Sequence, residues 1–435
     1  MNLILYLILW YGFEGIFTSG KYWSLPQIII SLSRKIDEIF ILLLLFQIIT
    51  NFHLKSRYIS NSIRLFSILY ISILFFSSVI NQTSPIILAE YFIRYGKGLI
   101  IFIYSIMFIE VNKNQILYFM KYLRIFFLLQ FFINGLWFVG IRLIPNGDYS
   151  NADWAIGTFG NPFYTSLFTS IVLSGCFYEL FIGKGISKRK IINFIYVLLC
   201  IIQLIWSDTK HLFFIIPLIL FFQLFLLNFI NSRKKILLIF LGLLISYNFT
   251  NTSLFYYLSD NFQTGKSLLL TSPKTMAYFH SFVTIPKEVP VAVLGAGPGK
   301  GGSFIGMEDN SVMTNKYFMK YNIESFRVGN TIMTVPYTGI NTIQSELGYI
   351  GFGLILFMLF FLFRSMYYDN KYNHTFKYGQ YFSKIDFVAF FCLLLFLTEN
   401  IFADLLQHTV FPILVWFFVA LYYLNNQKVI SKSSI

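Results

Sequence analysis

The sequence has few charged residues. Only 12% of its 435 residues are charged, whereas 57% are apolar and 20% are aromatic. A soluble domain typically carries about 25% charged residues, most of them on its surface. The shortage of charge therefore argues against a water-soluble globule. The abundance of apolar residues argues against a disordered chain, which requires low hydrophobicity and high charge. A polytopic membrane protein fits this composition.

Cysteine and motifs for soluble chemistry are also scarce. The three cysteines, Cys176, Cys200 and Cys392, lie inside apolar runs, so we expect packing roles and no disulfide framework. No His, Cys or Asp cluster has zinc spacing. Segment 294–301 resembles a phosphate loop, but Leu294 and Gly301 replace the first Gly and the Ser or Thr that this motif needs. We therefore expect no nucleotide site.

Acidic residues are outnumbered by basic ones. The 19 Asp and Glu stand against 33 Lys and Arg, which gives a formal net charge of +14. The cations are scattered in twos and threes between apolar runs, and the sequence has no basic tract or nucleic-acid-binding motif. We interpret the excess as charge that orients membrane spans, and we expect no nucleic acid partner.

Twelve apolar runs are predicted to be membrane spans, each of which needs about 20 mostly apolar residues. They are 2–18, 38–52, 62–80, 90–109, 124–143, 163–181, 191–206, 212–230, 236–248, 343–363, 385–400 and 409–424. Several runs are short, so the alternative that one of them is a re-entrant segment stays open. The sequence predicts an all-α polytopic membrane protein embedded in a lipid bilayer.

Lys and Arg in the connecting segments predict the orientation, because cytoplasmic loops carry an excess of these residues. One alternating set holds 19 of them, within 55–64, 113–124, 184–190, 233–235, 364–384 and 428–432. The opposite short segments hold five, namely Lys21, Arg34, Lys35, Arg142 and Lys210. Both termini are therefore expected to be cytoplasmic.

One long hydrophilic stretch falls between the ninth and tenth predicted spans, on the expected outer side. Loops of this length are usually functional. The predicted organisation is a membrane domain over 1–249 with nine spans, an external loop over 250–340, and a second membrane part over 341–435 with three spans and a cytoplasmic tail.

Ionisable residues in or beside a membrane span are costly and indicate function by default. On the expected outer side they form four groups: Glu90, Arg94 and Lys97; Asp208, Lys210 and His211; Lys274, His280, Lys300 and Arg327; and Glu399, Asp404 and His408. For each group a structural role stays open, as an internal ion pair, a solvated loop or a helix-end charge. A lipid-linked phosphate or pyrophosphate would explain outward-facing cations without a nucleotide site. A guanidinium suits bidentate phosphate binding best.

Several motifs together resemble the O-antigen polymerase and ligase superfamily. Segment 293–299 reads VLGAGPG, and segment 341–351 reads NTIQSELGYIG and opens a predicted span. Upstream, 157–162 reads GTFGNP, and 207–211 reads SDTKH where many members carry Ser-Arg. The long outer loop late in a chain of about twelve spans is similar as well.

The resemblance implies a glycosyltransferase with a GT-C-like membrane fold that needs no metal or other cofactor. It implies the bacterial cytoplasmic membrane and a role in O-antigen, capsule or exopolysaccharide synthesis. Donor and acceptor would be oligosaccharide units on polyprenyl pyrophosphate, with a chain-length regulator and a flippase as further partners. Superfamily ligases carry a functional His before the Asn of their motif. Here Ile340 precedes Asn341, which favours a polymerase.

In such a reaction a sugar hydroxyl attacks C1 of another unit and polyprenyl pyrophosphate leaves, so fixed cations should stabilise the leaving group. We predict Arg94, Lys210 and Arg327 for this role and Glu346 as general base, with Glu90, His280 or no base as alternatives. The residues predicted to bind substrate are Lys97, His211, His280, Gly297, Gly299, Lys300 and Asn341. The glycines of 295–299 are predicted to form a tight turn, with presentation of backbone amides to phosphate as a second role.

Two alternative functions stay open. A ligase-type transferase would move a finished glycan onto another acceptor. A glycolipid flippase or secondary transporter would also have about twelve spans with charges inside the membrane. Transporters are often built from repeated halves, and the sequence has no internal repeat.

Overall fold

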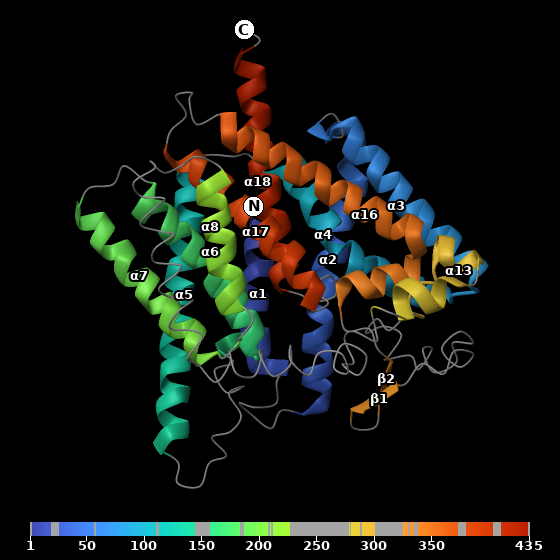
Figure 1. Cartoon of the computed structure of the whole chain (residues 1–435), viewed down its shortest axis with the longest axis horizontal. Helices are drawn as coiled ribbons and strands as arrows, with labels where there is room; N and C mark the ends of the chain where they lie inside the picture. The colour runs from blue at the N-terminus through green and yellow to red at the C-terminus, as the bar shows by residue number, and fades with distance from the viewer. Residues whose placement is uncertain are drawn as a thin grey trace.

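The computed structural model describes residues 2–18, 26–55, 58–109, 113–143, 157–182, 187–207, 209, 212–226, 278, 280–287, 289–300, 325–328, 331–334, 338–372, 380–402 and 410–433. These residues are mainly helical, with one short β-hairpin (Figure 1). Among them, five helices are long and apolar enough to cross a membrane: Lys35–Lys55, Asn61–Ile80, Tyr118–Leu136, Lys188–Trp206 and Gly339–Tyr368. The chain is therefore an α-helical protein suited to a membrane.

Helices occupy eleven of the twelve predicted spans, and the remaining one, 236–248, lies outside the described residues. The helices are α1 Asn2–Thr18, α2 Gln27–Lys55, α3 Asn61–Ile80, α4 Pro85–Phe108, α5 Lys113–Leu143, α6 Pro162–Phe181, α7 Ser187–Trp206, α8 Leu212–Leu226, α16 Gly339–Tyr372, α17 Gln380–Phe402 and α18 Val410–Ser433. Most of them extend beyond the apolar run that predicted them, because the hydropathy pattern detects only the part of a helix that suits lipid.

Short polar residues set the starts of three helices. Ser60 and Ser84 accept hydrogen bonds from Ile63 and Ile87 at the starts of α3 and α4. Asn161 accepts a hydrogen bond of 2.8 Å from the Phe163 amide at the start of α6. Proline follows the cap in α4 and α6, where its missing N–H costs nothing.

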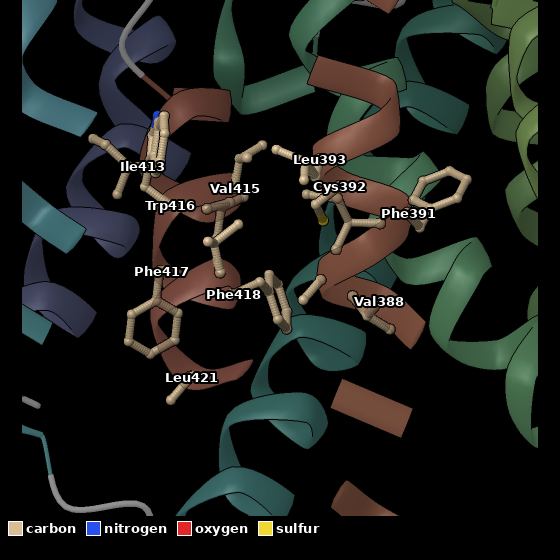
Figure 2. Close-up of a cluster of buried hydrophobic side chains, with 14 of the residues drawn as sticks. Val388, Phe391, Cys392, Leu393, Ile413, Val415, Trp416, Phe417, Phe418 and Leu421 are labelled. Atoms are coloured by element: carbon tan, nitrogen blue, oxygen red, sulfur yellow. The ribbon is translucent and has the colours of Figure 1, made fainter. Parts of the chain in front are cut away.

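The core of the bundle lies around α17 and α18. These two helices pack on each other, α18 also packs on α4, and α17 packs on α6. Figure 2 shows the contact, where Cys392 of α17 and Phe418 of α18 lie between the two helices, while Phe391 and Phe417 point outward on opposite sides. These four side chains are no more than 1% exposed. All three cysteines are free and buried, which confirms their predicted packing role.

Helices at the edge of the bundle expose large apolar side chains. Examples are Phe46 on α2, Phe76 on α3, Ile195 on α7 and Phe357 on α16, which are 49–67% exposed. Such a surface would be unfavourable in water, and it suits contact with lipid tails.

A second hydrophobic cluster joins α3, α4 and α16. It contains Tyr70 of α3, Tyr91 and Tyr95 of α4, and Ile343 and Leu347 of α16. We call it the α3–α4–α16 cluster. The rings of Tyr91 and Tyr95 stack with centroids 4.2 Å apart. Through this cluster the start of α16, helix α3 and the first half of α4 are linked.

The predicted external loop contains regular structure. It includes two short turns, η3 His280–Thr284 and η4 Ile285–Lys287, and the helix α13 Val289–Leu294. Strands β1 Ser325–Val328 and β2 Thr331–Thr334 form an antiparallel hairpin. In Figure 1, α13 lies beside α16 and near the end of α3, in agreement with their contacts.

Candidate functional site

The turn after α13 packs against a break in α16. Gly348 has φ 66° and ψ −170°, so the helix is interrupted there. The break releases the carbonyls of Ser345 and Glu346, which in a continuous helix accept bonds from residues four positions later. Here the Ala296 amide donates to the Ser345 carbonyl (2.7 Å) and the Gly297 amide donates to the Glu346 carbonyl (3.2 Å). The turn thereby replaces the lost helical bonds, as a low-dielectric membrane environment requires.

Glycine is required where the two backbones meet. Gly295 and Gly348 have φ of +73° and +66°, in the left-handed region that favours glycine. A Cβ on Gly295 would lie 2.2 Å from the Glu346 carbonyl carbon. A Cβ on Gly348 would lie 2.5 Å from the Val293 oxygen. These two glycines therefore allow the loop and the broken helix to touch.

Helix α3 completes this junction. The Ser77 hydroxyl lies 2.6 Å from the Leu294 carbonyl and 3.2 Å from the Glu346 carbonyl. The Asn81 side-chain amide donates to the Ser77 carbonyl (2.9 Å) and to the Gly295 carbonyl (3.0 Å). Three segments far apart in the sequence thus form one hydrogen-bonded unit. We call it the α16-break junction, comprising Ser77, Asn81, 291–300 and 345–348.

The predicted phosphate-binding groups of the turn form hydrogen bonds within the protein. The Gly297 amide bonds to the Glu346 carbonyl, and the Lys300 ammonium donates to the Asn81 carbonyl. Gly299, with φ +75°, lies in the turn that the Lys300 amide closes onto the Gly297 carbonyl at 3.0 Å. This geometry agrees with the tight turn that the sequence predicts. Phosphate binding by these residues stays a prediction.

The first segment of α16 is polar and buried. Asn341 and Glu346 are both 0% exposed. The Asn341 backbone amide donates to the Thr338 hydroxyl (3.3 Å), and the Ser345 hydroxyl donates to the Asn341 carbonyl (2.8 Å). The Glu346 carboxylate is close enough to interact electrostatically with Tyr70. Two predicted site residues therefore share one buried segment.

Two carboxamides in this segment lack hydrogen-bond partners among the described residues. Neither the amide nitrogen nor the oxygen of the Asn341 and Gln344 side chains is bonded there. Gln344 is 1% exposed. Sequence reasoning missed Gln344, although its spacing of three from Asn341 places both on one side of a helix. Buried polar groups are normally paired, so these carboxamides need an explanation, as does Gln203 of α7, which is also buried without a partner among the described residues.

The turn η3 packs beside the start of α16. The Thr338 hydroxyl donates to the Tyr278 hydroxyl (3.4 Å), and the Tyr349 hydroxyl donates to the Phe282 carbonyl (2.7 Å). Burial raises the pKa of the Tyr278 phenol, although the bond from Thr338 opposes this effect. Tyr278 is therefore protonated at neutral pH. Only the backbone of His280 is described, so the orientation of its side chain stays open.

Charged residues of α2 and α4 form an ion network. Lys35 lies 3.0 Å from Glu38 and 3.4 Å from Glu90, and Arg94 lies 3.4 Å from Glu38. The predicted cation Arg94 therefore has a carboxylate partner; the sequence left an ion pair within its own group open, and the structure gives Glu38 of α2 instead. Lys97, one helical turn further, is 2% exposed. Arg94 and Lys97 flank Tyr95, which belongs to the α3–α4–α16 cluster.

Three other predicted residues are not placed by the structure. Lys210 and His211 lie outside the described residues. Arg327 stands opposite Ile332 in the β-hairpin, and only its backbone is described. The structure thus brings Gly297, Gly299 and Lys300 together with Glu346. The α3–α4–α16 cluster links this junction to α4 through apolar packing.

The GTFGNP segment forms a turn held by α1 and α5. The Gly157 amide donates to the Asn134 side chain (2.7 Å), and the Thr158 amide donates to the Gln130 side chain (2.9 Å). The Thr158 hydroxyl donates to the Gly12 carbonyl of α1. This third superfamily-like motif therefore positions the start of α6.

Another charge cluster joins α5, α6 and α17. Glu179 pairs with Arg124 at 3.0 Å and also with Lys384. Arg124 additionally donates to the Asn193 side chain at 2.8 Å. The charge pattern of the sequence predicts Arg124 and Lys384 to be cytoplasmic loop cations. The structure places both within helices, where they share one carboxylate.

Within the part of the chain that the structure describes, no group of three or more His, Cys, Asp or Glu residues could hold a metal ion. No protein-family model matches the chain, and no curated protein matches it.

Proposed function

We propose that the chain is a polysaccharide polymerase of the bacterial cytoplasmic membrane. It joins oligosaccharide repeat units carried on polyprenyl pyrophosphate, on the outer side of the membrane. In this proposal the helices belong to a GT-C-like bundle of about twelve spans with both termini in the cytoplasm. The observation that carries the proposal is the α16-break junction, because two of the segments that resemble the superfamily, 293–299 and 341–351, meet there.

The chemistry of the neighbouring side chains supports a site at this junction. Glu346 is fully buried, and Arg94 and Lys97 lie on α4, which contributes to the α3–α4–α16 cluster. Buried ionisable residues in a membrane protein are costly and mark substrate paths by default. A pyrophosphate leaving group needs cations, and a sugar hydroxyl benefits from a carboxylate that accepts its proton.

The proposed reaction forms one glycosidic bond and breaks one phosphoester bond. A hydroxyl oxygen of the acceptor sugar attacks C1 of the donor sugar, and the C1–oxygen bond to polyprenyl pyrophosphate breaks. The hydroxyl proton passes to Glu346 or to water, and the bonding pair leaves with the pyrophosphate. Arg94, Lys210 and Arg327 are proposed to stabilise the departing charge. The activated donor supplies the driving force, so no nucleotide is needed.

Surface polysaccharide from a deletion strain tests this function. If the chain is a polymerase, the deletion leaves only single repeat units on the surface acceptor, and the intact gene restores long chains. Long chains that accumulate without attachment would instead indicate a ligase. Complete loss of surface glycan would indicate a flippase. Unchanged long chains in the deletion strain would rule out all three functions.

A further inference from the structure

The side-chain carboxamides of Asn341 and Gln344 in α16 are buried without hydrogen-bond partners among the described residues, which suggests a ligand. Asn341 and Gln344 are 0% and 1% exposed, and neither side chain has a hydrogen-bond partner among the described residues. A carboxamide carries two donor hydrogens and an acceptor oxygen. Burying these groups without partners is unfavourable. An external ligand that supplied those partners would remove this cost.

Helical spacing shows which way the two carboxamides face. Ile343 and Leu347 point toward α3 and α4 in the α3–α4–α16 cluster. With about 100° per residue, Asn341 is turned about 140° and Gln344 about 80° from the mean direction of Ile343 and Leu347, so neither carboxamide points straight into this cluster. The turn η3 also packs on α16. Its Ser281 hydroxyl is another group that is 1% exposed and has no partner in the described part of the chain.

We propose that Asn341 and Gln344 form a subsite for the hydroxyl groups of a sugar in the lipid-linked substrate. This inference rests on the proposed polymerase function and adds Gln344 as a substrate-binding residue. Neutral carboxamides can donate to and accept from neighbouring hydroxyls at the same time. A pyrophosphate is a poor match, because it is an anion and binds best to cations. In this proposal the carboxamides at the start of α16 recognise the sugar, and the cations recognise the pyrophosphate.

Substitutions of nearly equal size test this subsite. Asn341→Leu and Gln344→Met remove the hydrogen-bonding groups and keep most of the volume. Because no hydrogen bond to a described residue is broken, we expect the melting temperature of each purified variant to equal or exceed that of the parent. We expect each variant to lose at least about tenfold in polymerisation of lipid-linked repeat units extracted from the deletion strain, since a lost hydrogen-bonded contact of this kind changes affinity by about that factor.

Gln223→Met is the matched control. Gln223 is also a fully buried carboxamide, but its nitrogen donates to the Phe387 carbonyl at 3.0 Å. This variant breaks an internal bond, so we expect a lower melting temperature and parent-like polymerisation per amount of folded protein. The control and the subsite variants should therefore change stability and activity in opposite ways.

A binding measurement gives a second readout. The melting temperature of the parent should rise more with the lipid-linked repeat unit than with polyprenyl pyrophosphate that carries no sugar. In the double variant Asn341→Leu/Gln344→Met the two ligands should give equal shifts. A double variant that still distinguished them would overturn the inference.

Two further results would contradict the subsite. Parent-like polymerisation by both variants would mean that water fills this space. A parallel loss of stability and activity would mean that the carboxamides have partners within the folded protein. Either result leaves the proposed function intact if the deletion abolishes long chains. If the deletion strain still makes long chains, the polymerase function itself fails.

Discussion

Replacing Gly348 by alanine should destabilise the protein through the α16-break junction. The new Cβ would lie 2.5 Å from the Gly295 nitrogen and 2.5 Å from the Val293 oxygen. Both are backbone atoms, so no side chain can rotate away. An alanine held at φ 66° and ψ −170° costs about 1–3 kcal/mol, and forcing a methyl group into a packed site costs about 1–3 kcal/mol more. We therefore expect Gly348→Ala to lower the free energy of unfolding by about 2–6 kcal/mol.

The buried cysteines provide the assay. Cys176, Cys200 and Cys392 are free and buried, so a thiol-reactive fluorogenic dye reports the temperature at which the core opens. In one detergent, Gly348→Ala should unfold several degrees below the parent. Gly295→Ala should behave similarly, because its Cβ would lie 2.2 Å from the Glu346 carbonyl carbon.

Gly353→Ala is the control on the same helix. A Cβ there would have no heavy atom within 4 Å, and alanine favours a helix by about 0.5–1 kcal/mol over glycine. We expect an unchanged or slightly higher melting temperature for Gly353→Ala. If Gly348→Ala and Gly295→Ala melted at the parent's temperature, the backbone contact at the junction would be refuted.

Three other substitutions test the charges and the junction. Arg94→Ala should reduce polymerisation about 100-fold at equal membrane levels. The control Arg364→Ala removes an exposed arginine beside Tyr368 and should leave polymerisation unchanged. Persistent long chains in the Arg94 variant would exclude the proposed role of Arg94. Glu179→Gln leaves Arg124 and Lys384 without their carboxylate partner and should destabilise the protein by about 3–5 kcal/mol. A parent-like melting temperature would show that this charge cluster is solvated. Ser77→Ala removes the hydroxyl that bonds Leu294, so dye-monitored melting should show a loss of about 1–3 kcal/mol; an unchanged melting temperature would mean that this bond contributes nothing.

The positions of the helices were predictable because hydropathy is a local property. Apolar runs such as 62–80 and 163–181 differ from α3 and α6 by one residue at most. The glycine turn was also predictable, because its three glycines suit only a backbone that needs positive φ. These features depend on residues that are near one another in the sequence.

The arrangement of the polar groups was not predictable, because pairing across helices is a tertiary property. Nothing local indicates that Arg94 meets Glu38, or that Arg124 and Lys384 share Glu179. The break at Gly348 was also missed, since a glycine within an apolar helix is tolerated in many membrane spans. Only the approach of 291–297 from the long loop explains why the helix is interrupted there.

The most direct test of the polymerase proposal uses the purified chain in liposomes with lipid-linked repeat units extracted from the deletion strain. The proposal predicts a ladder of longer lipid-linked glycans and one released polyprenyl pyrophosphate for each new linkage, without added nucleotide. Repeat units that remained single under conditions where the protein is folded would contradict it.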